Sequence, residues 1–426
     1  MKNISFVTNC SKNTRQHLEL LLKSLRDNLD SRDHEIIVFI DSDNEGIHEY
    51  LWDMQVQFKD LRIVKNNMSP CTGYALNNNL LVKLAKYDIV SYLQSDMVVG
   101  PHYDTYILSQ LEDNMILSST RVEPPLHGYS DYTITKDFGT DPKKFSMKDW
   151  NAFSKTVISN KAAEYFFAPI TFYKSVWEKL GGYDTRFRRS REDSDLVQRA
   201  LHAGVRLVQT WEANVYHFTC VSSRGKDWFD KGNDEAQSRV TKQFHADQVE
   251  LKRFIRKWGS FNHGEYPLKK YDVDVIIRIN SQPHYCDFIS IVEPYVSKVW
   301  LEDDKCIEDL KLDTHSYANE LFGFSEDQWK FASKFYNTED AHLKSKIRVL
   351  KDNDIEYNAL LEINLQNNTQ INGEYIYKLH QIIEATEVGK WEMQDNMTLT
   401  IKNKVELQND ICAINPEFDM SLLTIE

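Results

Sequence analysis

Polar side chains stand at the ends of three apolar, strand-like segments within the first hundred residues. These are Thr8-Asn9 after ISFV, Asp41-Ser42-Asp43 after EIIVFI, and Gln94-Ser95-Asp96 after IVSYL. A carboxylate in such a place has either a structural partner or a ligand. Open α/β sheets bind ligands beyond the carboxyl ends of their strands. The pattern therefore predicts a binding site along one edge of a sheet.

The elements that must position these residues alternate between strands and helices. Strands are expected at 4–9, 35–43, 61–66 and 88–97, and amphipathic helices at 14–29 and 73–87. This order predicts a parallel sheet with right-handed crossovers. After an irregular stretch at 121–160, a helix is expected at 190–204, followed by strands at 205–210 and 213–218. The later segments can thus return to the same edge of the sheet.

Composition narrows the class of protein. A net charge of −13 argues against a nucleic-acid partner for the protein as a whole. No run of about 18 apolar residues is present, so no transmembrane helix is expected. The beginning MKNISFVTNC lacks the order of a signal peptide, and the six cysteines are scattered without a CxxC pair. We therefore expect a cytoplasmic protein in a reducing compartment.

A second group of chemical residues follows near the middle of the chain. GGYDTRFRRSREDSDLVQRALHAGVRLV begins at Gly181, and Val215-Tyr216-His217 comes shortly after it. In order and approximate spacing, these features and the Gln94-Ser95-Asp96 turn resemble family 2 glycosyltransferases of the GT-A fold, over about residues 3–235. The resemblance implies a Rossmann-like, mostly parallel sheet that binds a nucleotide-sugar donor. It also implies transfer of the sugar to a glycan or glycoconjugate acceptor.

The resemblance implies a divalent cation, Mn²⁺ or Mg²⁺, on the leaving diphosphate. Such a cation neutralises charge that develops as the glycosidic bond breaks, and carboxylate and imidazole groups can hold it. The matching ligands are Asp96 and His217. Gln94 replaces the first acid of the family's turn, which weakens the match. The alternatives are a turn-capping role for Asp96 and a core position for His217.

Inverting transfer needs a base that deprotonates the acceptor hydroxyl. The family residue that does this matches Asp193, with Glu192 as the alternate or as an acceptor contact. Both could instead be acids that favour the start of a helix. Asp195 lies on another side of that helix, so we expect it to be structural.

Nucleotide recognition is expected at the first strand ends. Thr8 matches the position beside the base, and Asp41 and Asp43 match acids that contact uracil or ribose, although two such acids could also form an Asx-type turn. Further donor contacts are expected from Gly73, Asn79, Gln94, Ser95 and Asp96, and from Arg224 and Lys226 in a polar loop. That loop could close over the donor as a cationic lid. The arginines between Arg186 and Arg191 could bind an anion or lie in solvent.

The character of the chain changes near Tyr266-Pro267. We expect a first domain at 1–262 and a C-terminal α/β module at 263–426 that could position the acceptor, form a homo-oligomer or dock a partner. Two other functions stay open. A sugar-nucleotidyltransferase is disfavoured because VTNCSKNTRQ lacks glycine, and a non-catalytic carbohydrate- or protein-binding module on a decayed transferase scaffold is suggested by Gln94.

Overall fold

A computed structural model of the chain contains two compact units. It describes residues 2–426 except 11–13, 42–45, 59, 68–72, 128, 165–166, 188–189, 220–248, 263, 265, 279–284, 303–344, 351–354, 366–372, 395, 408–411 and 416. The first unit comprises Met1–Thr241 together with Cys412–Glu426, and the second comprises Lys242–Ile411. The second unit is therefore an insertion within the first.

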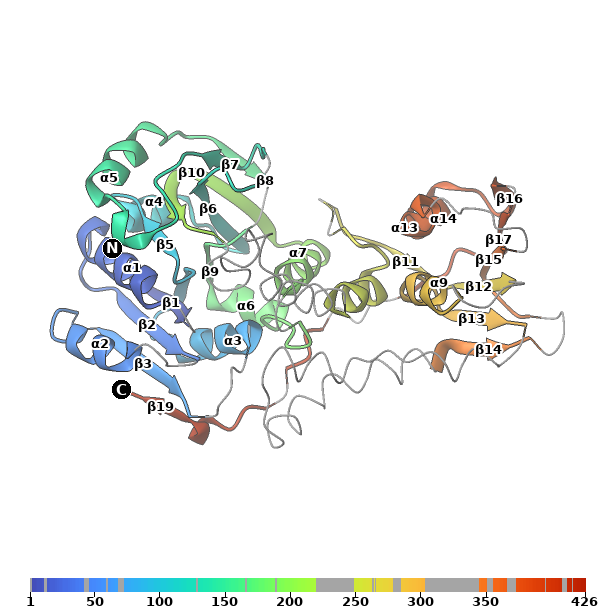
Figure 1. Cartoon of the computed structure of the whole chain (residues 1–426), viewed down its shortest axis with the longest axis horizontal. Coiled ribbons are helices and arrows are strands. Elements are labelled where there is room, and N and C mark those ends of the chain that lie inside the picture. Colours follow the sequence, from blue (N-terminus) through green and yellow to red (C-terminus); the bar gives the residue numbers. More distant parts are fainter. Residues whose placement is uncertain are drawn as a thin grey trace, which may run out of the picture. The chain divides into compact units, whose positions relative to one another are not determined.

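An eleven-stranded sheet forms the centre of the first unit (Figure 1). Its path runs β19-β3-β2-β1-β4-β9-β6-β10-β5, with β7 beside β6 and β8 beside β10. The strands are β1 (Ile4–Cys10), β2 (Glu35–Ile40), β3 (Leu61–Asn66), β4 (Ile89–Tyr92), β5 (Met97–Val99), β6 (Met115–Glu123), β7 (Thr133–Thr135), β8 (Ala162–Glu164), β9 (Ile170–Tyr173), β10 (Arg206–His217) and β19 (Leu423–Ile425).

Most of these strands run in one direction. β1 to β4 are parallel neighbours, and β10, β6 and β7 are parallel to one another. β9 is antiparallel to both β4 and β6, so the two parallel groups point the same way. The strands that run opposite to them are β5, β8, β9 and β19. The expected α/β class with a large, mostly parallel sheet is confirmed.

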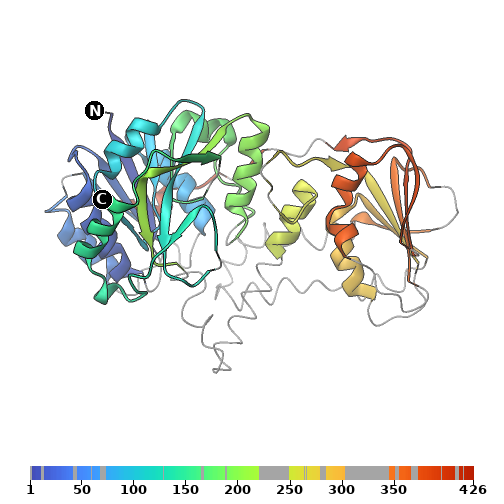
Figure 2. The same cartoon turned by 90° about the horizontal axis from the view of Figure 1, so that it is seen from above.

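Helices cover both faces of this sheet (Figures 1 and 2). They are α1 (Arg15–Asn28), α2 (Ile47–Met54), α3 (Tyr74–Leu84), α4 (Tyr103–Gln110), α5 (Met147–Thr156), α6 (Lys174–Leu180) and α7 (Glu192–His202). Leucines of α1, including Leu18 and Leu22, share one core cluster with residues of α2 and α4. Side chains of α3, α6 and α7 share the cluster on the other face. Burial of these apolar faces fixes the helices on the sheet.

The expected strand at 88–97 is two strands. β4 ends at Tyr92, and a turn in which Met97 N donates to Gln94 O leads into β5. β5 does not continue beside β4 but pairs antiparallel with β10 at the far edge of the sheet. The Gln94-Ser95-Asp96 turn therefore carries the chain from the middle of the sheet to its end.

The second unit has its own sheet, with the order β14-β13-β12-β15-β17-β16. Its first four strands are parallel and the last two form an antiparallel hairpin. The elements are β11 (Lys270–Tyr271), β12 (Val273–Arg278), α9 (Tyr285–Val292), β13 (Lys298–Leu301), β14 (Ile347–Val349), β15 (Ala359–Asn364), α13 (Glu374–Tyr377), α14 (Leu379–Ala385), β16 (Gly389–Gln394), β17 (Met397–Ile401) and β18 (Glu406–Leu407).

The division between the units lies ahead of the boundary expected near residue 262. Residues 249–258 are helical, and within them Ile255 enters the second unit's core while Arg256 forms an ion pair with Glu293 at 2.7 Å. This helix belongs to the second unit because its apolar and charged partners are there. At the other end, β19 pairs with β3 and Leu423 joins the first unit's core.

Candidate metal and catalytic site

Three side chains meet at the end of neighbouring strands in the first unit. Glu123 is the last residue of β6, His217 is the last residue of β10, and Asp96 immediately precedes β5. β6 and β10 are parallel, and His217 lies opposite Met97 in the antiparallel pairing with β5. Because β5 runs backwards, its beginning shares an edge with the ends of the other two strands. Tertiary pairing thus brings the expected residues Asp96 and His217 together.

The imidazole of His217 lies between two carboxylates. Its Nδ1 is 2.7 Å from Oε1 of Glu123, and its Nε2 is 3.6 Å from Oδ1 of Asp96. All three residues are buried. Burial alone would raise the pKa of Glu123, but the hydrogen bond from His217 and the charge of Arg121 outweigh it and lower the pKa to about 2. Glu123 is therefore ionised at neutral pH and accepts the Nδ1 hydrogen.

This arrangement fits a divalent cation. With its hydrogen on Nδ1, the His217 ring directs the Nε2 lone pair at Oδ1 of Asp96, and the two atoms lie beyond hydrogen-bond distance. A cation between these atoms would form a coordinate bond with each of them. Mg²⁺ is commonly held by one or two protein groups while phosphate and water fill its other positions, and Mn²⁺ accepts carboxylate and imidazole. No group of three or more His, Cys, Asp or Glu side chains among the described residues is arranged to hold a metal ion.

The expected base lies in the first turn of α7. Oδ1 of Asp193 accepts a hydrogen bond from Ser194 N at 2.6 Å. The carboxylate is half-buried, and its Oδ2 receives no hydrogen bond from the part of the chain that the structure describes. Glu192 begins the same helix. Asp195 is fully buried and forms an ion pair with Arg199 at 2.8 Å, so the expected structural role of Asp195 has a partner.

The buried tyrosines Tyr92 and Tyr183 and the partly buried Tyr74 adjoin the first turn of α7. The ring of Tyr74 packs edge-on against Tyr92 and tilted against Tyr183, with centroid distances of 5.5 and 5.8 Å. Burial raises the pKa of Tyr92 above its usual range, and the carboxylates of Asp96 and Glu192 act in the same direction. The Tyr92 hydroxyl thus lies close enough to interact electrostatically with Asp96 in the turn before β5 and with Glu192 at the start of α7. Sequence reasoning missed this cluster, because only packing shows that the three rings meet.

Two expected nucleotide contacts lie at adjacent strand ends. Thr8 is near the end of β1, and its buried hydroxyl has no hydrogen-bond partner among the described residues. Asp41 follows β2, and its backbone N–H donates to Cys10 O at 3.0 Å. Asn66 Nδ2 is 3.4 Å from Asp41 Oδ1. A buried hydroxyl without a protein partner is a suitable group for a ligand to contact.

The two residues expected around α3 have structural explanations. Gly73 precedes the helix with φ of 96°, a conformation that residues with a side chain rarely adopt. Asn79 holds the backbone of Tyr183 through both amide atoms, at 2.8 Å each, and also donates to Asn415 at 3.0 Å. Its amide is therefore engaged in linking α3, the Gly-Gly-Tyr turn and the C-terminal segment.

The remaining expected contacts divide into two groups. Gln94 is half-buried, and Ser95 is buried in the turn before Asp96. Asp43, Arg224 and Lys226 lie outside the described residues, so their expected roles stay predictions. Among the arginines of the 186–191 segment, Arg186 forms an ion pair with Asp184 at 2.6 Å.

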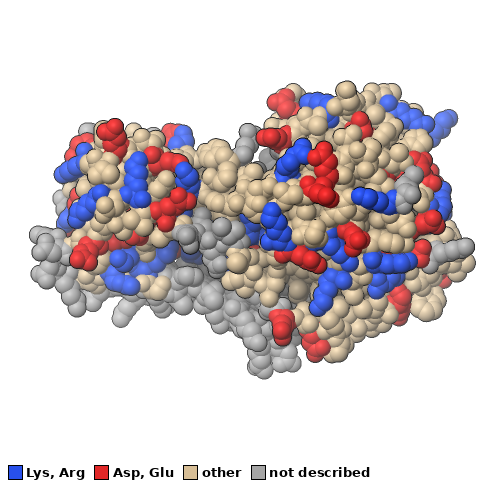
Figure 3. Space-filling model, turned by 180° about the vertical axis from the view of Figure 1, so that it is seen from behind, with Lys and Arg blue, Asp and Glu red and all other residues tan. Residues whose placement is uncertain are grey.

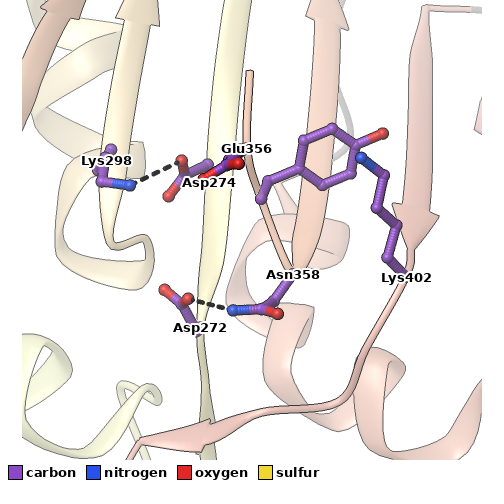
Figure 4. Close-up of a pocket in the computed structure, with 7 residues that line it drawn as sticks. Asp272, Asp274, Lys298, Glu356, Asn358 and Lys402 are labelled. Carbon is purple, nitrogen blue, oxygen red and sulfur yellow. Dashed lines mark hydrogen bonds and ion pairs between the residues drawn. The ribbon is translucent and has the colours of Figure 1, made fainter. Parts of the chain in front are cut away.

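The second unit contains a separate polar pocket of about 390 Å³. Figure 4 shows Lys298 beside Asp274 and Asn358 beside Asp272, at 3.6 and 2.8 Å. It lies where β12 and β13 begin, and it is also lined by Glu356, Tyr357 and Lys402. Two of its three acids thus already have a cationic or amide partner. We therefore do not place the catalytic chemistry in this pocket.

On the side of the molecule seen in Figure 3, the described residues form no strongly basic face. Lys and Arg side chains alternate there with Asp and Glu side chains. No helix among the described residues is long and apolar enough to span a membrane.

The first unit is therefore a mixed α/β domain with acidic and imidazole groups at one edge of its sheet. No protein-family model matches the sequence, and no curated protein matches it. Solved glycosyltransferase structures show similarity. GalNAc-T7 with UDP, GalNAc and Mn²⁺ has 14% identity and a TM-score of 0.41, covering 51% of this chain and 44% of that chain.

Two further structures give similar values. TarS from S. aureus has 14% identity and a TM-score of 0.40, covering 62% of this chain and 44% of that chain. The mannosyltransferase PcManGT from Pyrobaculum calidifontis, in complex with GDP-Man and Mn²⁺, has 18% identity and a TM-score of 0.38, covering 58% and 64%. The chain thus spans less than half the length of the first two. At these sequence identities and TM-scores, the activity has to be inferred from the residues of the site itself.

Proposed function

We propose that the protein is an inverting, divalent-metal-dependent glycosyltransferase. Its donor would be a UDP- or GDP-sugar and its acceptor a glycan or glycoconjugate. The observation that supports this most directly is the pairing of His217 Nε2 with Asp96 at 3.6 Å on the sheet edge. Two ligating groups on one side of a cation leave room for the oxygens of a diphosphate.

In this mechanism Asp96 and His217 would hold Mn²⁺ or Mg²⁺, which when bound would neutralise charge on the leaving diphosphate. The Thr8 hydroxyl and the Asp41 carboxylate contact the nucleotide at the ends of β1 and β2. Asp193 accepts the acceptor's hydroxyl proton on Oδ2 while that hydroxyl oxygen attacks the anomeric carbon. The bond to the diphosphate breaks in the same displacement, so the anomeric configuration inverts.

The other residues have supporting roles in the proposal. Glu192 is the alternate base or an acceptor contact, because it begins the same helix as Asp193. Tyr74, Tyr92 and Tyr183 form an aromatic wall beside these acids, in which Tyr92 and Tyr183 are buried. The second unit would position the acceptor or mediate a homo-oligomer.

The test measures sugar transfer and donor hydrolysis for UDP- and GDP-sugars, with and without Mn²⁺. Asp96→Ala should abolish Mn²⁺-dependent binding of UDP or GDP in calorimetry. Asp193→Asn keeps the side-chain shape and should lower transfer by about a hundredfold or more while donor binding changes little. Proton NMR coupling at the anomeric carbon should show a product of opposite configuration. Retained configuration, or near-normal transfer by Asp193→Asn, would refute the mechanism.

A second candidate function follows from Gln94. A neutral amide replaces the family's first acid, so the unit could be a non-catalytic carbohydrate- or protein-binding module. The same assay separates the two, because a binding module would bind sugar without metal-dependent donor turnover.

A further inference from the structure

Two buried histidine–carboxylate pairs among the described residues use the imidazole differently. In the first, His34 Nε2 lies 2.9 Å from Asp104 Oδ2, and His34 Nδ1 accepts the backbone N–H of Ile4 at 3.1 Å. Both nitrogens of His34 therefore have structural partners. In the second, His217 Nδ1 pairs with Glu123, while Nε2 faces the carboxylate of Asp96 outside hydrogen-bond distance.

The partners of each ring determine which nitrogen carries the hydrogen. A backbone N–H can only donate, so His34 Nδ1 must be unprotonated and its hydrogen lies on Nε2. An ionised carboxylate can only accept, so the 2.7 Å contact with Glu123 places the hydrogen of His217 on Nδ1. The two histidines should therefore be opposite tautomers. For His217, this leaves the Nε2 lone pair directed at Asp96.

We propose that Glu123 is a positioning residue that holds His217 in the Nδ1–H tautomer and keeps Nε2 available as a ligand. The assignment of a cation to that nitrogen rests on the proposed function. A metal-bound imidazole commonly donates its other N–H to a carboxylate, which fixes the ring and increases its basicity. Glu123 was absent from the sequence prediction, because β6 shows no motif at its end.

The surroundings of Glu123 suit this role. Its side chain is 8% exposed, so water does not compete strongly for the Nδ1–H. Arg121, two residues earlier on β6, lies 3.4 Å from the same carboxylate oxygen and helps to keep it ionised. The parallel pairing of β6 with β10 fixes the separation of the two side chains through the backbone ladder. The Glu123 carboxylate thus orients the His217 ring from the Nδ1 side and does not occupy the position of a metal ion at Nε2.

The first experiment needs no substitution. Nitrogen-15 NMR of the imidazole rings in the metal-free full-length protein, at mildly alkaline pH, reports the tautomer of each histidine. We expect His217 as Nδ1–H and His34 as Nε2–H in the same spectrum. His217 found as Nε2–H would overturn the proposal, and His34 provides the internal reference for the opposite form.

The second experiment titrates the protein with Mn²⁺ alone and follows broadening of the His217 ring resonances. Glu123→Gln should require about 10- to 100-fold more Mn²⁺ than the wild type, as for other residues that support metal ligands. Glu112→Gln is the matched control, because Glu112 is exposed and pairs with Arg206, and its titration should match the wild type. Glu123→Asp, which keeps the charge, should recover part of the affinity.

The outcomes separate this inference from the proposed function. An unchanged Mn²⁺ midpoint in Glu123→Gln would overturn the positioning role. If the wild-type His217 resonances do not respond to Mn²⁺ although His217 is the Nδ1–H tautomer, the metal assignment fails and the orientation by Glu123 stands. Circular dichroism of Glu123→Gln checks that the comparison uses folded protein.

Discussion

The third acid of the Glu-Asp-Ser-Asp sequence is expected to stabilise the fold and to take no part in proton transfer. Asp195 and Arg199 are both buried on α7, one helical turn apart, with Nε to Oδ2 at 2.8 Å. Arg199 Nη1 also donates to the carbonyl oxygen of Leu180, which ends α6. The pair therefore joins α7, whose first turn carries the candidate base, to its neighbour.

Asp195→Asn leaves the guanidinium buried without a counter-charge, and arginine cannot lose its proton to relieve this. Removing one partner of a buried ion pair costs about 3–5 kcal/mol. At about 1.4 kcal/mol per tenfold change, the unfolding equilibrium of the first unit should rise by roughly two to nearly four powers of ten. The double variant Asp195→Leu/Arg199→Met should be far less destabilised, because it leaves no unpaired charge.

Hydrogen exchange read by mass spectrometry suits a two-unit chain, because it resolves stability by peptide. Peptides of α7 and β1 should lose protection in Asp195→Asn, while peptides of β12 in the second unit should not change. Breaking the exposed pair Arg206–Glu112 by Glu112→Gln should cost less than about 1 kcal/mol. A loss below about 1 kcal/mol in Asp195→Asn, or a double variant less stable than the single one, would contradict the reasoning.

The other predictions concern stability and its pH dependence. Leu423→Ala should destabilise the first unit by about 2–3 kcal/mol, because Leu423 is buried in its core. The control is Ile425→Ala on the same strand. Because Ile425 is 43% exposed, this substitution should have little effect in the same exchange assay. Burial lowers the pKa of His380 from 6.5 to about 3, so the stabilising effect of its neutral form is fully present above pH 6.5 and is lost as the pH falls towards 3. In urea unfolding, the free energy of unfolding of the second unit should therefore decrease by up to about 1.4 kcal/mol per pH unit in this range. An unchanged free energy between pH 6.5 and 4.5 would refute this. Gly182→Ala should lower the melting temperature, because its φ is 71° and a new Cβ would lie 2.4 Å from Asn79 Oδ1; an unchanged melting temperature would count against this packing.

The C-terminal segment after residue 411 belongs to the first unit, so the second unit cannot be deleted by a simple C-terminal truncation. Truncation near residue 262 would also delete Leu423 and Asn415, whose partners are in the first unit. The activity of such a truncated protein would therefore not report on the second unit alone. Replacing only Lys242–Ile411 by a linker would keep β19 on β3. That variant should retain the circular dichroism of a folded α/β domain, and loss of that signal would contradict the division into units.

Local sequence determined the elements that carry the candidate site. Leu18, Leu22 and Leu25 recur at helical spacing, and the helix lies at Arg15–Asn28 as expected within a residue or two. The helix from Glu192 was likewise predicted, because helical periodicity and acids in the first turn act over a few neighbours. The two strands expected at 205–210 and 213–218 are instead the single strand Arg206–His217. The polar residues at the strand ends could therefore be recognised as candidates.

Only the tertiary structure decided which of these residues meet. The apolar residues on both sides of Gln94-Ser95-Asp96 read as one strand, yet β5 turns back to pair with β10 and so sets Asp96 beside His217. Glu123 carries no sequence signal, and its role follows from the pairing of β6 with β10. Strand pairing joins residues that are about a hundred positions apart through backbone hydrogen bonds, and those bonds leave no period in the sequence. The chemistry of the candidate side chains could thus be predicted from the sequence. Which of these side chains lie next to one another was decided by long-range packing.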